Sequence, residues 1–161
     1  MRIGIVSDTH NQLRNCERIV EILNAARVER VVHAGDITQA KTLRVLAGLS
    51  APLCGVYGNN DRERPSLEAA CEELGLHFVD PPLRIEWAGR RIVVVHDPLE
   101  IDAALLSGCD VALHGHDHQR LIERRNGALV VNPGECAGHL PGHNAVGVLD
   151  LARLSVEIKL F

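Results

Sequence analysis

Aromatic side chains, excess charge and long hydrophobic runs are all scarce in this sequence. Its 161 residues include one Trp, one Tyr and two Phe, and the formal net charge is −4. Proteins that bind nucleic-acid polymers usually combine a basic surface with aromatic side chains on which bases stack. A polymeric nucleic acid is therefore not an expected partner.

Hydrophobic runs of membrane-spanning length are also missing. The apolar stretches are only a few residues long, whereas a transmembrane helix needs about 20 apolar residues. Asp8 interrupts the first apolar stretch too early for the hydrophobic region of a secretory signal. The five cysteines form no C-x-x-C pair and their number is odd, which favours reduced thiols over a disulfide framework. We therefore expect a cytoplasmic protein without a membrane segment.

The length suits one domain, and no repeat, low-complexity tract or linker divides the chain. The sequence therefore predicts a single domain over residues 1–161. Histidine, by contrast, is abundant. Nine are present, and three of them, His114, His116 and His118, fall within five residues. This cluster is the first indication of a functional site.

Hydrophobic patterns in the first half alternate between strands and helices. They predict strands over 2–7, 30–34 and 53–57, and helices over 11–27, 39–48 and 66–74. Thr38 is the expected N-cap of the second helix, and Gly75 closes the third. Three successive βα units predict a parallel sheet covered by helices.

The second half has the pattern of hairpins. The expected strand pairs are 83–87 with 91–96, 120–125 with 128–132, and 145–151 with 154–160. The turn Asn126-Gly127 is a strong hairpin signal. A short helix over 101–107 precedes a strand over 110–113. Parallel βα units followed by hairpins predict an α/β sandwich of two packed sheets with helices outside.

Ligand-type residues follow the ends of the predicted strands, where binding sites of open α/β sheets lie. The segments are Ser7-Asp8-Thr9-His10, Gly35-Asp36, Gly58-Asn59-Asn60-Asp61, His96 and Gly115-His116-Asp117-His118. Oxygen and imidazole ligands suit divalent Mn, Fe, Co, Ni or Zn rather than a thiolate site. The sequence therefore predicts a metal centre.

The spacing of these residues adds detail. In an extended chain, residues i and i+2 project to the same side, so Asp8 with His10, and His116 with His118, are expected to chelate as pairs. Two carboxylates, one amide and four imidazoles exceed the needs of one ion but fit two. Two ions about 3.5–4 Å apart suit in-line attack at phosphorus.

These five motifs, in this order, resemble the signature of the calcineurin-like metallophosphoesterases, and most closely their small single-domain YfcE-like phosphodiesterases. The resemblance runs from Asp8 to Asn132-Pro133-Gly134. It implies a four-layer α/β/β/α sandwich of two mixed sheets. It also implies a binuclear metal-dependent phosphodiesterase or phosphatase, which hydrolyses small phosphodiesters by attack of a metal-bridging hydroxide.

The same resemblance assigns roles to individual residues. One metal would be held by Asp8, His10 and His118, the other by Asn59, His96 and His116, with Asp36 bridging. Asp61 would orient a ligand or a nearby donor. The catalytic set is then Asp36, Asn59, Asn60, Asp61 and His96, and the substrate contacts are Asn59, Asn60 and His96. The expected cofactor is a pair of divalent ions, with Mn²⁺ as first choice and Fe, Ni, Co, Zn or Mg as alternatives.

Three positions depart from the family pattern. Asn60 stands where many catalytic members have a His that protonates the leaving group, Asp97 where Gly is usual, and Glu135 where Ser often follows Asn-Pro-Gly. General acid–base help is typically worth about 10²–10⁴-fold, so we expect a strong dependence on the pKa of the leaving group. His139 and His143, in the segment 134–142 and just after it, are candidates for the missing proton donor.

Three alternative functions differ from this one in what they require of the sequence. A catalytically weak or inactive protein-binding scaffold of the same fold, as in the retromer scaffold subunit, stays open, although all seven ligand positions carry competent residues. The run 114–118 is similar to the H-x-H-x-D-H motif of metallo-β-lactamase-fold enzymes, but its spacing is one residue short. A DNA nuclease would need a basic track that is missing. The expected substrate is a small phosphodiester or nucleotide, and homo-oligomer formation stays open.

Overall fold

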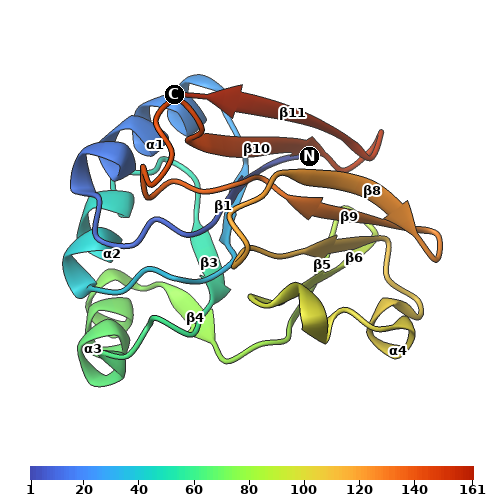
Figure 1. The fold of residues 1–161 in the computed structure, drawn as a ribbon, viewed down its shortest axis with the longest axis horizontal. Helices are drawn as coiled ribbons and strands as arrows, with labels where there is room; N and C mark the ends of the chain where they lie inside the picture. Colours follow the sequence, from blue (N-terminus) through green and yellow to red (C-terminus); the bar gives the residue numbers. More distant parts are fainter.

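The computed structural model describes residues 1–161 and arranges eleven strands in two sheets (Figure 1). The strands are β1 (Arg2–Val6), β2 (Arg30–His33), β3 (Leu53–Val56), β4 (His77–Val79), β5 (Leu83–Trp87), β6 (Arg90–Val94), β7 (Val111–Leu113), β8 (Leu121–Arg125), β9 (Ala128–Asn132), β10 (Ala145–Asp150) and β11 (Ser155–Leu160). The helices are α1 (Leu13–Ala25), α2 (Ala40–Leu46), α3 (Arg64–Leu74) and α4 (Ala103–Leu106), with a short 3-10 helix η1 (Pro98–Glu100).

Both sheets are mixed. The first has the order β11-β10-β1-β2-β3-β4. Strands β1, β2 and β3 are parallel, as the predicted βα units require, and β4, which is not among the predicted strands, continues the parallel set. The C-terminal hairpin adds antiparallel to β1. The second has the order β5-β6-β7-β9-β8, with β6, β7 and β9 parallel and the hairpin partners β5 and β8 at the edges.

Three apolar layers hold the sandwich together. Helices α1 to α3 pack on the first sheet through residues such as Ile19 and Leu43. The two sheets face each other through residues such as Ile5 and Val94. Leu106 of α4 packs on the outer face of the second sheet. The layers are therefore α/β/β/α, which confirms the predicted four-layer sandwich of two mixed sheets.

One local prediction is wrong. The N-cap of α2 is Gln39, not Thr38. Thr38 has a left-handed φ of 68°, and its backbone N–H donates to Oδ1 of Asp61 at 2.6 Å. The contact with Asp61 fixes this residue in a turn, so its side chain does not cap the helix. Gly75, by contrast, ends α3 in the left-handed conformation that the sequence predicts, with φ of 65°.

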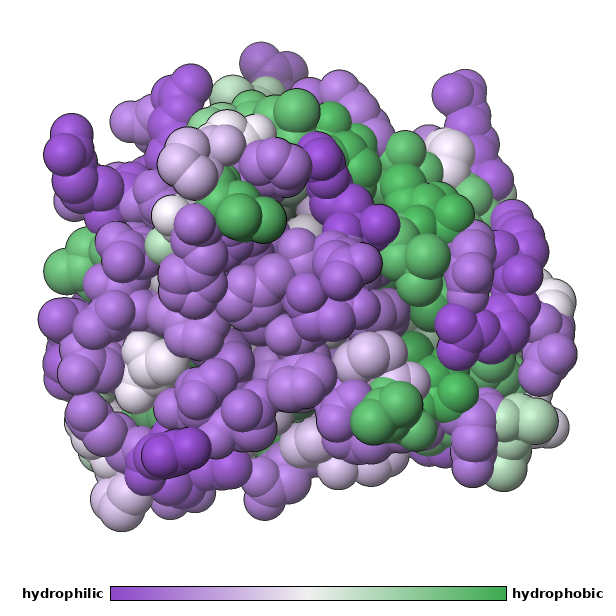
Figure 2. Space-filling view, in the orientation of Figure 1, coloured by the Kyte–Doolittle hydropathy of each residue, from purple (hydrophilic) through white to green (hydrophobic).

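The surface is mainly hydrophilic on the face shown in Figure 2, where hydrophobic residues gather chiefly in a band to the right of the centre. The large hydrophobic side chains that are exposed are Leu99, Ile122, Leu140 and Leu160. None of the helices has the length and apolar composition needed to cross a membrane.

Candidate metal centre

Seven ligand-type side chains follow the carboxyl ends of five strands. These are β1, β2 and β3 of the first sheet and β6 and β7 of the second, and within each sheet they run parallel. The loops after these strands meet at one edge of the sandwich, the usual place for a ligand site in such sheets. The structure brings all seven residues together there: Asp8, His10, Asp36, Asn59, His96, His116 and His118.

Five of these seven residues have left-handed backbone conformations. The φ angles are 52° at Asp8, 45° at His10, 61° at Asp36, 75° at His116 and 59° at His118. Such angles are uncommon outside glycine and cost on the order of 1–3 kcal/mol each, so they persist only where surrounding contacts enforce them. The strained turns bend each loop at the strand end, so that short side chains converge on the same space.

A first group consists of Asp8, His10 and His118. The Nε2 of His118 lies 3.5 Å from Oδ1 of Asp8, and the Nε2 of His10 lies 3.8 Å from Oδ2 of Asp36. Ligand atoms of Asp8, His10 and Asp36 all lie within 4.8 Å of one another. Asp8 and Asp36 are almost completely buried, so their two negative charges lie in a region from which bulk water is excluded.

The protonation of Asp8 and His10 favours cation binding. Burial would raise the pKa of Asp8, but the neighbouring polar groups of His118 and Ser7 and the nearby imidazoles hold it below its usual value. The Asp8 carboxylate raises the pKa of His118, so this ring must release a proton when an ion binds. Burial lowers the pKa of His10. Near neutral pH, Asp8 is therefore ionised and His10 carries a free lone pair, as metal ligation requires.

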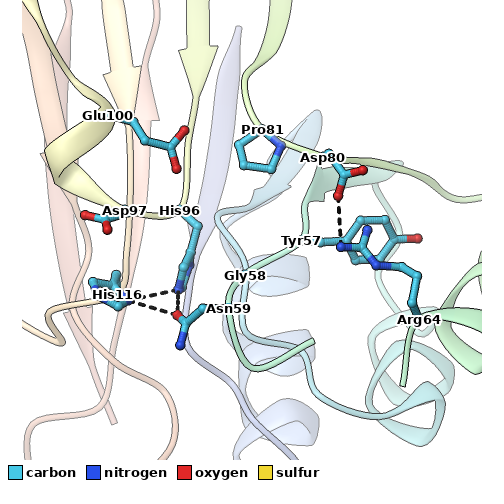
Figure 3. Close-up of a pocket in the computed structure, with 10 residues that line it drawn as sticks. All are labelled: Tyr57, Gly58, Asn59, Arg64, Asp80, Pro81, His96, Asp97, Glu100 and His116. Carbon is cyan, nitrogen blue, oxygen red and sulfur yellow. Dashed lines mark hydrogen bonds and ion pairs between the residues drawn. The ribbon is translucent and has the colours of Figure 1, made fainter. Parts of the chain in front are cut away.

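A second group consists of Asn59, His96 and His116 (Figure 3). The Oδ1 of Asn59 lies 2.9 Å from Nε2 of His96 and 3.0 Å from Nδ1 of His116, and these two nitrogens are 3.3 Å apart. Asp36 touches both groups, because its Oδ1 lies 3.4 Å from Nε2 of His96 while its Oδ2 faces His10. Its position fits a carboxylate shared between two ions.

The tautomer of His96 is fixed by the backbone. Its Nδ1 lies 2.8 Å from the carbonyl oxygen of Ala34, which only a protonated nitrogen can approach favourably. Nε2 therefore keeps its lone pair and points at Asn59 and Asp36. A main-chain acceptor behind a ligating histidine is a common feature of metal sites.

The donor set fits divalent ions. Two ligands on an ion, each about 2.1 Å away and at right angles, are about 3.0 Å apart, and the second group shows separations of 2.9–3.3 Å. In the first group, the buried Nε2 of His10 has no hydrogen-bond partner. A cation satisfies such converging lone pairs, whereas the protein itself does not.

The expected pairing of residues two apart is wrong for His116 and His118. The left-handed φ angles mean that the loop is not extended, so the two side chains diverge. His116 faces Asn59 and His96, while His118 faces Asp8. Asp8 and His10 do lie together, although through a strained turn rather than through strand geometry.

Asp61 and Asn60 support this arrangement through Asp36. The carboxylate of Asp61 accepts backbone N–H groups from Gly58 at 2.6 Å, Thr38 at 2.6 Å and Asp36 at 3.0 Å. It therefore ties together the turns that carry Asp36 and Asn59. Asn60 donates its side-chain amide to Oδ2 of Asp36 at 2.7 Å and its backbone N–H to Oδ1 at 2.9 Å.

Glycines make room for these contacts. A Cβ at Gly35, where φ is 99°, would lie 2.5 Å from Nδ1 of His96. A Cβ at Gly58 would collide with Oδ1 of Asp36, and one at Gly115 with the side chains of Ser7 and Asp8. Each glycine lets the backbone approach a ligand side chain more closely than any other residue allows.

The segment that carries these loops matches a known protein family. The model of the calcineurin-like phosphoesterase superfamily domain matches residues 1–153, which carry all seven side chains. The chain belongs to the calcineurin-like phosphoesterase superfamily. This confirms the resemblance drawn from the five motifs, and it makes the protein a hydrolase of phosphoric ester bonds that depends on divalent metal ions.

Similar proteins cover nearly the whole of this superfamily member. It is 36% identical over 154 residues to the phosphodiesterase MJ0936 of Methanocaldococcus jannaschii, with 93% of each chain covered. The solved structure of a novel archaeal phosphodiesterase has a TM-score of 0.88 at 32% identity and covers 100% of both chains. The phosphoesterase Yfce from E. coli shares the fold, with a TM-score of 0.74 at 22% identity over 99% of this chain and 98% of its own.

Two further residues, Asn132 and His33, stabilise the ligand-bearing loops although the superfamily motifs give them no ligand role. Asn132 donates to Oδ1 of Asp117 at 2.7 Å and so braces the loop between His116 and His118. His33 has its pKa lowered to about 4 by burial, and it hydrogen-bonds Thr9 at 2.9 Å. These contacts join residues far apart in the sequence, so no local pattern reveals them.

Proposed function

We propose that this phosphoesterase is a two-metal phosphodiesterase that acts on small phosphodiesters. The observation that carries the proposal is the convergence of six ligand side chains, in two groups of three, on either side of a seventh, Asp36. The similarity to two proteins described as phosphodiesterases supports a diester substrate over a monoester.

In this proposal the first group holds one ion, the second group holds the other, and Asp36 is shared. When bound, two divalent ions supply a water nucleophile at neutral pH and positive charge for the phosphoryl oxygens. Asp8 and Asp36 contribute −2 to the centre and two ions +4, which leaves +2. An acidic protein thus offers a locally positive site to phosphate, because the ions dominate the field. The mixed oxygen and imidazole ligands suit several divalent ions, of which Mn²⁺ is the proposed metal and Fe, Ni, Co, Zn or Mg are the alternatives.

The protein's own residues have distinct tasks. Ala34 and Asp61 hold His96 and the Asn59 turn in place, so the ligands are oriented before substrate arrives. Asn59 and His96 face the substrate side and are the proposed substrate contacts, with Asn60 beside them. The side-chain amide of Asn60 donates a hydrogen bond to Asp36 and so orients the shared carboxylate. Because an amide carries no acidic proton, Asn60 does not protonate the departing alkoxide.

A cavity of about 300 Å³ adjoins the second group and offers a place for one arm of the diester (Figure 3). Its walls include the carboxylates of Asp80, Asp97 and Glu100. Arg64 is paired with Asp80 at 2.8 Å and lies over the ring of Tyr57. Because the wall has more negative than positive groups, we propose that it accepts a small neutral or hydroxylated arm and disfavours a polyanionic polymer.

The proposed compartment is the cytoplasm. All five cysteines are free, which supports a reducing environment. A protein-binding scaffold without chemistry is disfavoured, because a scaffold has no need for five ligand residues with strained backbone conformations, one of them the buried shared carboxylate.

The test is a phosphodiesterase assay with and without Mn²⁺. Metal-loaded protein should hydrolyse bis(4-nitrophenyl) phosphate faster than 4-nitrophenyl phosphate, and chelation followed by Mn²⁺ should remove and restore the activity. Asp36→Asn serves as the control that any activity belongs to this site. An inert protein that binds no metal would support the scaffold instead.

A second assay tests the missing proton donor. Rates on aryl alkyl phosphodiesters with a graded series of leaving groups should fall steeply as the leaving-group pKa rises, because Asn60 offers no acidic proton where many family members have a His. A flat rate across aryl and alkyl leaving groups would contradict the role given to Asn60.

A further inference from the structure

Glu135 is a buried carboxylate behind the first group. It follows the Asn132-Pro133-Gly134 segment, at a position where the family often has Ser, and it is only 1% exposed. Its Oε1 accepts the backbone N–H of Leu140 at 2.8 Å, and its Oε2 accepts that of His139 at 3.2 Å. The loop from 134 to 142 is thus folded around this side chain, although no salt bridge to Lys or Arg offsets its charge.

Two imidazoles face the same oxygen. Oε2 of Glu135 lies 3.4 Å from Nδ1 of His118 and 3.5 Å from Nδ1 of His139. The two rings are stacked, with an interplanar angle of 8° and centroids 5.1 Å apart. His139 is more than half exposed and covers the ring of His118 from the solvent side.

The carboxylate decides which nitrogen of His118 carries a proton. A carboxylate accepts hydrogen bonds and repels a lone pair, so the Nδ1 that faces it is the protonated nitrogen. Nε2 faces the other carboxylate, that of Asp8, at 3.5 Å, so the same argument gives it a proton while no ion is bound. When an ion of the first group takes the place of that proton, Nε2 becomes the ligand atom and Glu135 keeps the remaining proton on Nδ1. In many metal sites, a carboxylate accepts a hydrogen bond from one nitrogen of a histidine whose other nitrogen binds the metal, and this contact orients and strengthens the histidine ligand.

We propose that Glu135 is a positioning residue of the metal centre, which holds His118 in the tautomer and orientation that bind the ion of the first group. The second group has no such carboxylate, since His96 is held by the carbonyl of Ala34. Glu135 therefore strengthens one of the two ion sites selectively. This inference rests on the two-ion centre proposed above.

The experiment compares metal binding by the wild type, Glu135→Gln and two control variants. Glutamine keeps the size and an acceptor oxygen but removes the charge. His139→Ala removes the second imidazole, whose Nδ1 lies 3.3 Å from Nδ1 of His118 and which lies within 4.8 Å of ligand atoms of His10 and His118, and it leaves the contact between Glu135 and His118. Glu123→Gln makes the same chemical change on β8, where the side chain pairs with Arg125. Metal-free proteins are titrated with Mn²⁺ against a competing chelator, and Zn²⁺-loaded proteins give the ¹⁵N shifts of the His118 ring.

The wild type should bind two ions, and Glu135→Gln should bind one of them about 10–100-fold more weakly and the other unchanged. His139→Ala should change either affinity less than threefold, and Glu123→Gln neither. The Nδ1 of His118 should have the shift of a protonated nitrogen in the wild type and move toward a mixture of tautomers in Glu135→Gln.

Any other result would contradict either the role of Glu135 or the two-ion centre. Equal weakening of both ions with a lower melting temperature in Glu135→Gln would mean a structural role only. A loss in His139→Ala as large as in Glu135→Gln would make His139 the relevant group. Unchanged binding by Glu135→Gln, with two ions bound to the wild type, would overturn this inference alone. A wild type that binds no ion would overturn the proposed function as well.

Discussion

The two ligand groups differ in charge, burial and access. The first contains the buried Asp8, adjoins the shared Asp36 and has Glu135 behind it. The second contains no carboxylate of its own, and it borders the cavity of about 300 Å³. Anionic, enclosed ligands retain a cation, whereas neutral ligands beside a cavity leave room for substrate. If two ions bind as proposed, the first group is expected to hold its ion firmly, and the second group a substrate-facing, more exchangeable ion.

The largest expected effect comes from a substitution at Asp36, the residue that both ligand groups share. In Asp36→Asn, the charge shared between them is lost, so both ions should bind more weakly and diester hydrolysis should fall by about 10³-fold or more, or ~4 kcal/mol. Mn²⁺ content and kcat/KM report the two effects. Full activity in this variant would place the chemistry outside this centre.

The pH dependence of stability tests the role of His33, which hydrogen-bonds Thr9, between Asp8 and His10, and Gly35, next to Asp36. Burial lowers the pKa of His33 from 6.5 to about 4, so the unfolded state binds a proton there that the folded state does not. The free energy of unfolding should therefore fall as pH drops from 6.5 to 4, with up to about 3 kcal/mol from this residue.

The control for that titration is His33→Asn, which keeps an acceptor for the backbone N–H of Gly35. In metal-free protein its unfolding free energy should depend less on pH across the same window. Denaturant unfolding at several pH values measures both proteins. Parallel pH profiles would show that His33 is not the group responsible.

Single-group variants separate the two ions. Asp8→Ala should release the firmly held ion, while His96→Ala should release the substrate-facing ion and leave the first bound. Activity should fall by roughly 10²-fold or more in both, since both ions are needed. Metal analysis after gel filtration distinguishes them. Retention of both ions in either variant would break the division into groups.

The smallest expected effect is an increase in activity, produced by a substitution at Asn60. Asn60→His places an imidazole beside the shared carboxylate, where it has a proton to give. Alkyl phosphodiesters should be hydrolysed about 10-fold faster, at the low end for general acid catalysis, whereas good 4-nitrophenyl leaving groups should gain little. A matched pair of alkyl and aryl substrates measures the ratio, and an equal change on both would argue against proton donation.

Much of this arrangement follows from the sequence, for reasons that are local. Alternating strands and helices, with Gly75 as a helix end, give the parallel strands β1, β2 and β3 of the first sheet. Ligand-type residues at the strand ends give the seven members of the centre. Such signals lie within a few residues of each other, so periodicity and motif order are enough to recover them.

What the sequence does not reveal depends on contacts between distant segments. The C-terminal hairpin joins β1 through a register set only by tertiary packing. His116 and His118 diverge because their turns are left-handed, which extended-chain geometry does not anticipate. Glu135 reaches His118 across 17 positions of sequence, and its role was visible only as a departure from the family pattern.

The central claim is that two ions lie on either side of Asp36, and anomalous diffraction from crystals grown with Mn²⁺ tests it most directly. Two anomalous peaks are expected, one among Asp8, His10 and His118 and one among Asn59, His96 and His116. Brief chelation should weaken the second peak before the first. A single peak, peaks elsewhere, or the second peak outlasting the first would contradict the division of the centre into a firm and an exchangeable site.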